Sequence, residues 1–333
     1  MAADAGLIGE LSEIARRALA PFTTDEPYAL VDFPNHSNVG DSAIWAGEIA
    51  YLKRHAPRPP SYVCSIANFS MDELKSRSPS GPIYIHGGGN FGDIWPHHQA
   101  FRNRLLELFP DRQIVQLPQS IHFSSPEKLA ETARAIEQHG RFTLFVRDKE
   151  SFELAQKHFG CETILCPDMA FFIGPIERPQ AAELDVLCLL RTDLERVDLG
   201  DAVRSGPDLR VADWLTEPKF GLQVAKAVGA LGGAASGGPG GLRLGMFNAA
   251  AETRVRRGAQ LLSSGRAVVT DRLHTHIISL LLGIPHAVLD NSYGKVSRFM
   301  SCWTSASPLT QRCDSMADAL EWARAQAAGA RAN

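Results

Sequence analysis

Two histidines and an arginine stand inside an apolar stretch of this sequence, VVTDRLHTHIISLLLGIPHAVLDN at 268–291. The pattern predicts a buried strand that runs into an apolar helix over 272–282. Arg272, Leu273 and His274 then occupy the first turn, where unpaired backbone N–H groups and the positive end of the helix dipole lie. A guanidinium and an imidazole added to that turn predict a site for phosphate or carboxylate, with His274 available for proton transfer.

The residues around that turn carry simpler expectations. Thr270 or Asp271 is expected to cap the helix through its side-chain oxygen. His274 and His276 are two positions apart, so on a helix they point ~200° away from each other and do not readily share one ion. We therefore expect no metal at this segment, and we expect His276 to be a buried core histidine.

A polar loop, NHSNVGDSAIW at 35–45, follows the first expected strand of the chain. Asn38 and Asp41 crowd a tight turn, and Ser42 is placed to cap a helix that ends near His55. Ordinary turn and capping chemistry explains this pattern as well as a binding loop does.

A glycine-rich segment, YIHGGGNFGDIWPHH at 84–98, ends another expected strand. Its glycines match the spacing of a dinucleotide-binding loop, but Pro96 predicts that the next helix begins after the loop, so we reject that interpretation. Glycines still allow backbone N–H groups to approach an anion or a sugar closely. The residues that could contact such a ligand are Gly88, Gly89, Asn90, Trp95, His97 and His98. Exposure at the start of a helix is the simpler interpretation of the two histidines.

Two arginines end apolar strands. Arg147 lies in VRDKES after the run FTLF, and Arg191 ends LDVLCLLR. Ligands of open parallel sheets bind outside the carboxyl ends of the strands, so both side chains are expected at a binding rim. Pairing with a neighbouring acid at the surface is the simpler alternative for each of them.

The elements that must position these residues alternate between strand and helix, which predicts an α/β fold of parallel sheets covered on both faces. The polar segment 174–183 indicates a linker. It divides the chain into an N-terminal α/β domain at 1–175, a C-terminal α/β domain at 176–310, and a C-terminal helix and tail at 311–333. The composition of LGGAASGGPGGL at 231–242 predicts a mobile loop, either a lid or a disordered surface loop.

Composition narrows the class of protein. The formal net charge of -3 gives no electrostatic case for binding nucleic acid. No stretch reaches the ~18–20 apolar residues of a membrane span. The six cysteines include no CxxC pair, so reduced thiols and a cytoplasmic location are expected. The segment IARRAL at 14–19 leaves peripheral contact with the inner face of a membrane as an alternative to a solvated helix face.

Taken in order, these segments resemble the polysaccharide pyruvyl transferase family. The resemblance rests on NVGDSAI, IHGGGNFGDIW, IVQLPQS, VRDKES, CPDMAF and VVTDRLHTHIISLLLGIP, which run from residue 38 to residue 285. It implies a fold similar to GT-B glycosyltransferases, with two Rossmann-like domains facing a cleft. It also implies transfer of pyruvate from phosphoenolpyruvate, without a cofactor, to two hydroxyls of a sugar residue. The product is a cyclic ketal and phosphate, and the acceptor is a cell-surface polysaccharide or its lipid-linked precursor.

The resemblance also implies roles for individual residues. His274 and Asp41 are expected to be catalytic. The donor side is expected to comprise Arg272, Leu273, Arg147, Arg191, Asn38, Gly88, Gly89 and Asn90. The acceptor side is expected to comprise Trp95 and one or both of His97 and His98.

Two other classes of function compete with this reading. A GT-B glycosyltransferase with a nucleotide-sugar donor needs a ribose carboxylate late in the second domain, where LDNSYGK at 289–295 offers only Asp290. Stabilisation by nucleotide sugars but not by phosphoenolpyruvate would favour it. A non-catalytic sugar-binding module is the second alternative, which a turnover assay separates from an enzyme.

Overall fold

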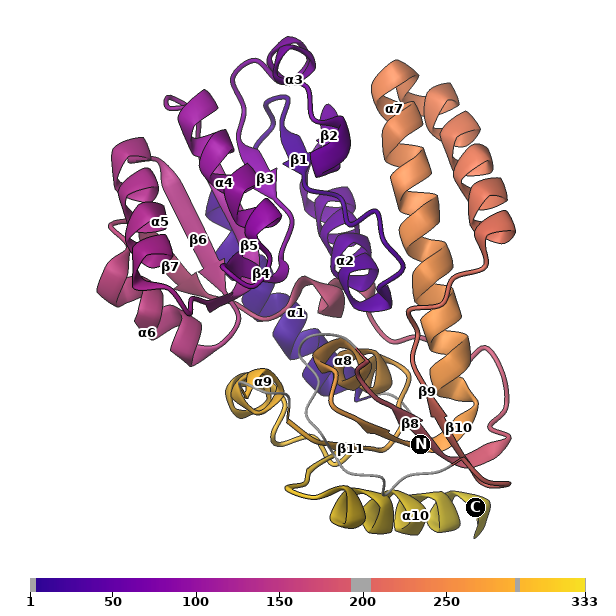
Figure 1. Ribbon diagram of the computed structural model, residues 1–333. Helices are drawn as coiled ribbons and strands as arrows, with labels where there is room; N and C mark the ends of the chain where they lie inside the picture. The colour runs from indigo at the N-terminus through magenta and orange to yellow at the C-terminus, as the bar shows by residue number, and fades with distance from the viewer. Residues whose placement is uncertain (1–3, 193–204, 291–293, 333) are drawn as a thin grey trace.

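The structure is a computed structural model that describes residues 4–192, 205–290 and 294–332. Within these residues the chain forms two parallel β-sheets, and helices that alternate with the strands along the chain cover both sheets (Figure 1). The α/β class expected from the alternating pattern is confirmed. The segment expected as a linker, 174–183, contains no helix or strand and joins the two sheets.

Seven strands in the described part of the chain form the N-terminal sheet, in the order β2-β1-β3-β5-β6-β7, with β4 paired beside β5. All of these pairs are parallel. The strands are β1 (Ala29–Val31), β2 (Tyr62–Cys64), β3 (Ile83–Ile85), β4 (Gly88–Gly92), β5 (Ile114–His122), β6 (Phe142–Val146) and β7 (Glu162–Leu165).

Five strands of the described residues form the second sheet, in the order β12-β11-β10-β8-β9, again all parallel. They are β8 (Leu184–Leu189), β9 (Leu209–Ala212), β10 (Gly265–Thr270), β11 (His286–Val288) and β12 (Thr310–Arg312). Both sheets therefore follow the doubly wound order 2-1-3 and onward, in which the first strand lies between the second and the third.

The helices cover the sheets according to which side each strand residue faces. The α-helices are α1 (Ala5–Leu19), α2 (Val39–His55), α3 (Met71–Arg77), α4 (Pro96–Leu108), α5 (Pro126–His139), α6 (Lys149–His158), α7 (Lys219–Ser263), α8 (Leu273–Leu281), α9 (Lys295–Trp303) and α10 (Met316–Ala332). Ala29 and Val31 of β1 pack toward α3, α4, α5 and α6, while Leu30 packs toward α1, α2 and α7. This alternation is the two-residue period of a strand buried on both faces.

The second sheet is covered in the same way. Val268 of β10 packs with α8 and α9, whereas Val269 packs against α10. The segment 311–333, expected as a helix and tail, contributes to β12 and supplies α10, so it packs as part of this sheet. Figure 1 shows α10 lying along the far side of the second sheet, away from the N-terminal sheet.

Two local expectations were wrong. The helix expected from Ser42 begins at Val39, because Asn38 is its cap and accepts a hydrogen bond from the Gly40 N–H at 3.0 Å. The glycine-rich segment is not only a loop, because Gly88–Gly92 forms β4 beside β5. The following helix begins at Pro96, after the glycines, as the sequence predicted.

The mobile loop expected at 231–242 was also wrong, since this segment is helical and belongs to α7. Glycines recur at every fourth position from Gly229 to Gly245. A straight helix would separate Gly229 from Gly245 by ~24 Å. A Cβ on Gly229 would instead overlap the carbonyl oxygen of Gly245, and one on Gly233 would overlap that of Gly241. The segment therefore turns back on itself as a helical hairpin, closely packed because its facing residues have no side chains (Figure 1).

Candidate active site

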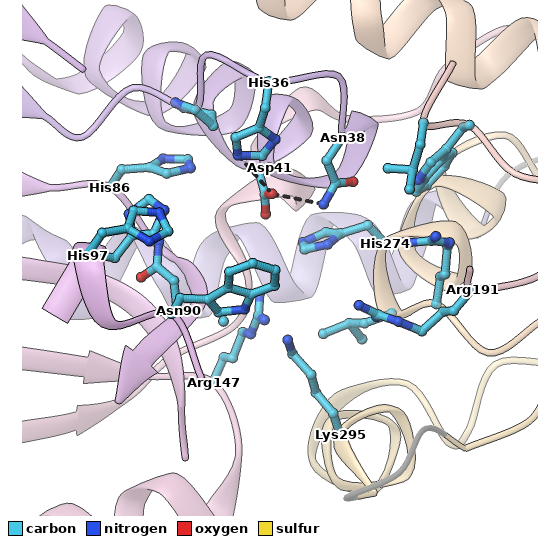
Figure 2. Close-up of a pocket in the computed structure, with 18 residues that line it drawn as sticks. His36, Asn38, Asp41, His86, Asn90, His97, Arg147, Arg191, His274 and Lys295 are labelled. Atoms are coloured by element: carbon cyan, nitrogen blue, oxygen red, sulfur yellow. Dashed lines mark hydrogen bonds and ion pairs between the residues drawn. The ribbon is translucent and has the colours of Figure 1, made fainter. Parts of the chain in front are cut away.

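A cavity of about 400 Å³ lies where the carboxyl ends of the two sheets face each other. In each sheet the strand order runs in one direction from the first strand to the second and in the other direction from the first strand to the third. Ligands of doubly wound folds bind in the crevice between the first and third strands, where this order reverses. Residues that follow β1, β3 and β6 line the cavity from one side, and residues that follow β8 and β10 line it from the other. Figure 2 shows these side chains converging from both halves of the molecule.

The cavity collects nearly all of the residues singled out from the sequence. Its lining contains Asn38, Asp41, Gly89, Asn90, Trp95, His97, His98, Arg147, Arg191, Arg272, Leu273 and His274. Gly88 is not part of the lining; a Cβ built on it would lie 3.8 Å from Asp41 Oδ1, so it backs that carboxylate instead. The lining also contains residues that the sequence analysis did not select: Pro34, His36, His86, Trp214, Leu215 and Lys295.

The start of α8 differs from the expected capping. The helix begins at Leu273, with Arg272 as the cap residue and no side-chain cap. The hydroxyl of Thr270 accepts the Arg272 N–H at 3.1 Å, and Asp271 instead accepts the backbone N–H of Arg191 at 2.9 Å. Asp271 thereby ties the end of β8 to the end of β10. Burial raises the pKa of Asp271 to about 6.

The Arg272 side chain enters the cavity beside an acid. Its Nη2 lies 2.7 Å from the Asp213 carboxylate, and the residue is 3% exposed. The arginine is therefore held in place before any ligand binds. Next to it, the N–H groups of the first turn of α8 have no side-chain cap, which leaves that helix end suited to an anion.

His274 lies between the N-terminus of α2 and a buried ion pair. A Cβ on Gly40 would lie 2.5 Å from His274 Nδ1, so the bare backbone of α2 packs directly against the imidazole. On its other side, His274 Nε2 lies 3.4 Å from Asp168 Oδ2, within ion-pair distance but without hydrogen-bond geometry. Asp168 also pairs with the fully buried Arg147.

Arg147 approaches the cavity from the end of β6. Its Nε donates to Ser120 Oγ at 3.0 Å and its Nη1 to Asp168. Its Nη2 is buried and has no hydrogen-bond partner among the described residues. A Cβ on Gly89 would lie 3.2 Å from that Nη2 and would overlap the ammonium of Lys295, so both cations border Gly89. The glycine leaves space for the two cations to meet one ligand.

Asp41 is the carboxylate that faces these cations. It accepts a hydrogen bond from Asn38 Nδ2 at 2.8 Å and lies 3.6 Å from His36 Nε2 (Figure 2). Burial alone would raise the pKa of Asp41, but His36, His274, and more distant cations hold it below its usual value. Asp41 is therefore an ionised acceptor of protons at neutral pH.

The glycine-rich side of the cavity is held by a buried polar network. Asn90 Oδ1 accepts hydrogen bonds from Arg102 at 3.0 Å and from Gln119 at 2.9 Å. His98 Nδ1 lies 2.9 Å from Asp32, the described non-glycine residue with positive φ, at 70°. The rings of His97 and His98 lie 4.3 Å apart at an angle of 43°, and burial lowers the pKa of His97. Both candidate histidines, His97 and His98, line the cavity.

His276 does not belong to the site. It is buried in the core, where its two ring nitrogens meet His286 at 2.7 Å and Thr304 at 2.8 Å. Burial lowers its pKa well below the ordinary value. Across the residues that the structure describes, no group of three or more potential His, Cys, Asp or Glu ligands gathers around a point that could hold a metal ion.

The comparisons with known proteins agree on one family. The family model "Polysaccharide pyruvyl transferase" matches residues 38–293, which span the whole cavity lining except for its first two residues and Lys295. This chain belongs to the polysaccharide pyruvyl transferase family. It is 34% identical over 295 residues to pyruvyl transferase 1 of Schizosaccharomyces pombe, covering 83% of this chain and 69% of that protein. It is 31% identical over 285 residues to the putative pyruvyl transferase EpsO of Bacillus subtilis, covering 84% and 86%.

A solved structure supports the fold of this family member. A functionally uncharacterised protein of Klebsiella pneumoniae superposes with a TM-score of 0.56 over 92% of this chain and 99% of that one. Its sequence identity is 16%, so the likeness concerns the fold alone. Membership of the family makes the protein a transferase of the pyruvyl transferase class with a saccharide acceptor.

Six residues of the cavity lining were missed in the sequence, and three of them, His36, His86 and Lys295, have titratable side chains. His36 lies in the polar loop that was singled out, but turn chemistry explained that loop equally well. His86 was treated as the end of an apolar strand. Lys295 follows LDNSYG, a segment in which only the carboxylate of Asp290 suggested ligand binding; of that segment, 291–293 lie outside the described residues.

Proposed function

We propose that this protein transfers pyruvate from phosphoenolpyruvate to two hydroxyls of one sugar residue, forming a cyclic ketal and releasing phosphate. The observation that carries the proposal is the composition of the cavity. Cationic side chains enter it from both sheets, namely Arg147, Arg191, Arg272 and Lys295, beside the uncapped start of α8. A ligand with a carboxylate and a phosphate close together needs such a divided set of cations.

The same cavity offers groups for the two kinds of proton transfer. In our proposal His274 delivers a proton to the methylene carbon of the donor, and Asp168 provides a negative charge 3.4 Å from its Nε2. A sugar hydroxyl then gives its proton to Asp41 and bonds to the central carbon, phosphate leaves, and the second hydroxyl closes the ring. General acid–base groups of this kind contribute typically ~10²- to 10⁴-fold.

The acceptor would lie on the N-terminal side of the cavity. Trp95, His97 and His98 form a face there suited to stacking on a sugar ring and to bonding its hydroxyls. We also propose that the two sheets form a GT-B-type arrangement, which is supported by their shared doubly wound order and by the cavity between their switch points.

A lipid-linked acceptor would bring the protein to a membrane surface. No described helix is long and apolar enough to cross a bilayer. The outer face of α7 nevertheless exposes an apolar stripe of Phe220, Val224, Val228 and Leu231, of which Phe220 is 84% and Leu231 is 74% exposed. No acidic residue occurs between Lys219 and Ala251. We propose that this α7 stripe rests on an anionic bilayer surface.

The α7 stripe also lies close to the cavity. Lys226 of the same helix arm donates to Asn35 at 3.1 Å, one residue before His36 in the cavity lining. A lipid-linked sugar held at the bilayer surface would thus be presented near the acceptor side.

Acceptor-dependent release of phosphate from phosphoenolpyruvate is the test of the proposed activity. Stabilisation by nucleotide sugars, without stabilisation by phosphoenolpyruvate, would favour the glycosyltransferase alternative instead.

A further inference from the structure

His86 and Glu48 form a buried pair that the proposed reaction has not yet used. His86 follows β3 and is 2% exposed, while Glu48 lies on α2 and is fully buried. His86 Nδ1 lies 2.8 Å from Glu48 Oε2, and Glu48 Oε1 accepts the Gly87 N–H at 2.8 Å. Both oxygens of the carboxylate are therefore engaged, and the imidazole is fixed with its Nδ1 toward Glu48.

The other ring nitrogen of His86 is directed at the cavity. His86 belongs to the cavity lining, and Figure 2 shows its ring pointing toward His36 and Asp41. Its Nε2 is buried and has no hydrogen-bond partner in the described structure. A buried polar atom left without a partner is unfavourable, a cost that a purely structural ion pair would not need to bear.

The charges around His86 favour a group that accepts protons. The groups facing it are Glu48 and Asp41 from α2, Asp32 after β1, and His36 in the loop before α2. Burial alone would lower the pKa of His86, but the Glu48 carboxylate raises it above the ordinary value. With Nδ1–H bonded to Glu48, neutral His86 presents a lone pair at Nε2, the arrangement of a histidine base oriented by a carboxylate.

Ketal formation removes protons from two different hydroxyls of the acceptor, so two bases at different positions in the cavity would each be suited to one of them. Resting on the proposed function, we infer that His86 is a second catalytic base, which takes the proton of one acceptor hydroxyl at Nε2 while Glu48 acts as its positioning residue. The hydroxyl oxygen bonds to the central carbon of the pyruvyl unit as its O–H bond breaks. Asp41 serves the other hydroxyl.

The protons balance over one turnover. One hydroxyl proton replaces the one that the methylene carbon gains, and the other leaves on phosphate. No oxidant, reductant or cofactor is needed. His86 returns to its neutral form when its proton passes to the departing phosphate or to water.

The test compares wild type with His86→Asn and Glu48→Gln over a range of pH, with His158→Asn, an exposed histidine on α6, as control. Acceptor-dependent phosphate release, phosphoenolpyruvate affinity and melting temperature are measured for each. We expect His86→Asn to lower kcat by ~10²- to 10³-fold while donor affinity changes by less than ~3-fold. His158→Asn is expected to match wild type.

The pH dependence of activity distinguishes a catalytic role of His86 from a purely structural one. A base must be unprotonated to act, so wild-type activity should fall as pH drops through the raised pKa of His86. Glu48→Gln removes the charge that raises this pKa, so the acid limb should move to lower pH and kcat should fall less than in His86→Asn. Loss of folding alone would not move the limb.

Two outcomes would overturn the inference. If wild type turns over and folded His86→Asn does so at a similar rate and with the same acid limb, the dyad is not catalytic and the proposed function stands. If wild type releases no phosphate with any acceptor, the proposed function fails and the dyad assignment fails with it.

Discussion

Arg147 and Arg272 each reach the cavity with a carboxylate already at their side. Arg147 is fully buried with Asp168, while Arg272 pairs with Asp213, which keeps part of its side chain in solvent. Pre-paired arginines have their geometry fixed before a ligand arrives, which favours binding by limiting the entropy lost. The acids also keep the empty cavity from holding several uncompensated positive charges.

Removing the deeper of these acids should destabilise the protein. Asp168→Asn leaves Arg147 buried without a countercharge, which costs roughly 3–5 kcal/mol of unfolding free energy by urea titration. Asp213→Asn is the matched control and should cost less, because the Asp213 side chain is 13% exposed and solvent reaches the pair there. Similar losses in both variants would contradict this account of Arg147.

The same pair predicts a direction with pH. Burial alone would raise the pKa of Asp168, but Arg147 and His274 hold it well below its usual value. A carboxyl whose folded pKa is lowered stabilises the fold above its unfolded pKa of about 4 and loses that effect as pH falls. The difference in unfolding free energy between wild type and Asp168→Asn should therefore be largest above pH ~4 and shrink below it.

Two helix starts meet at His274, and a single glycine permits the contact. The first turn of α2 packs on the imidazole in the first turn of α8 because Gly40 has no Cβ. Gly40→Ala should keep the fold, since alanine favours helix, yet push His274 from its place. We expect kcat to drop on the order of 10²-fold, the typical cost of misplacing a reacting group by ~1 Å.

Gly9→Ala on α1 is the control for that substitution. Nothing lies within 4 Å of a Cβ at Gly9, so neither activity nor stability should fall. The measurements are kcat and melting temperature for both Gly40→Ala and Gly9→Ala. A Gly40→Ala protein with wild-type turnover would show that His274 is not held by α2.

Among the helices and strands, the sequence predicted those features that depend on local sequence patterns. Alternating strands and helices, the helix start at Pro96 and the gathering of polar strand ends all followed from periodicity and from the rule for parallel sheets. The hairpin of α7 did not, because glycine composition indicates flexibility, whereas the contact between Gly233 and Gly241 depends on a turn that brings distant residues together. His86 was missed for a similar reason, since its partner Glu48 is 38 positions away.

Over the whole molecule, the α7 stripe faces outward while the cavity lies between the sheets. We predict that the protein binds vesicles containing anionic lipid, and that the double substitution Val228→Ser with Leu231→Ser abolishes co-sedimentation without loss of turnover on a soluble acceptor. Ile14→Ser, on the exposed face of α1, changes the segment 14–19 that is the alternative membrane contact, and it should bind as wild type if α7 makes the contact. Wild type that stays in the supernatant, or a double variant that still sediments, would contradict membrane contact through α7.

The proposed pyruvyl transfer needs both sheets, because neither sheet alone supplies both the proposed acid–base groups and the full set of cations. The most direct measurement is phosphate release from phosphoenolpyruvate, with and without a panel of synthetic and lipid-linked saccharides, by wild type and Arg272→Ala. We predict release that requires an acceptor and that falls at least ~10²-fold in the variant, the usual scale for removing a group that stabilises developing charge. Release by neither protein with any saccharide, together with no binding of phosphoenolpyruvate by wild type, would contradict it.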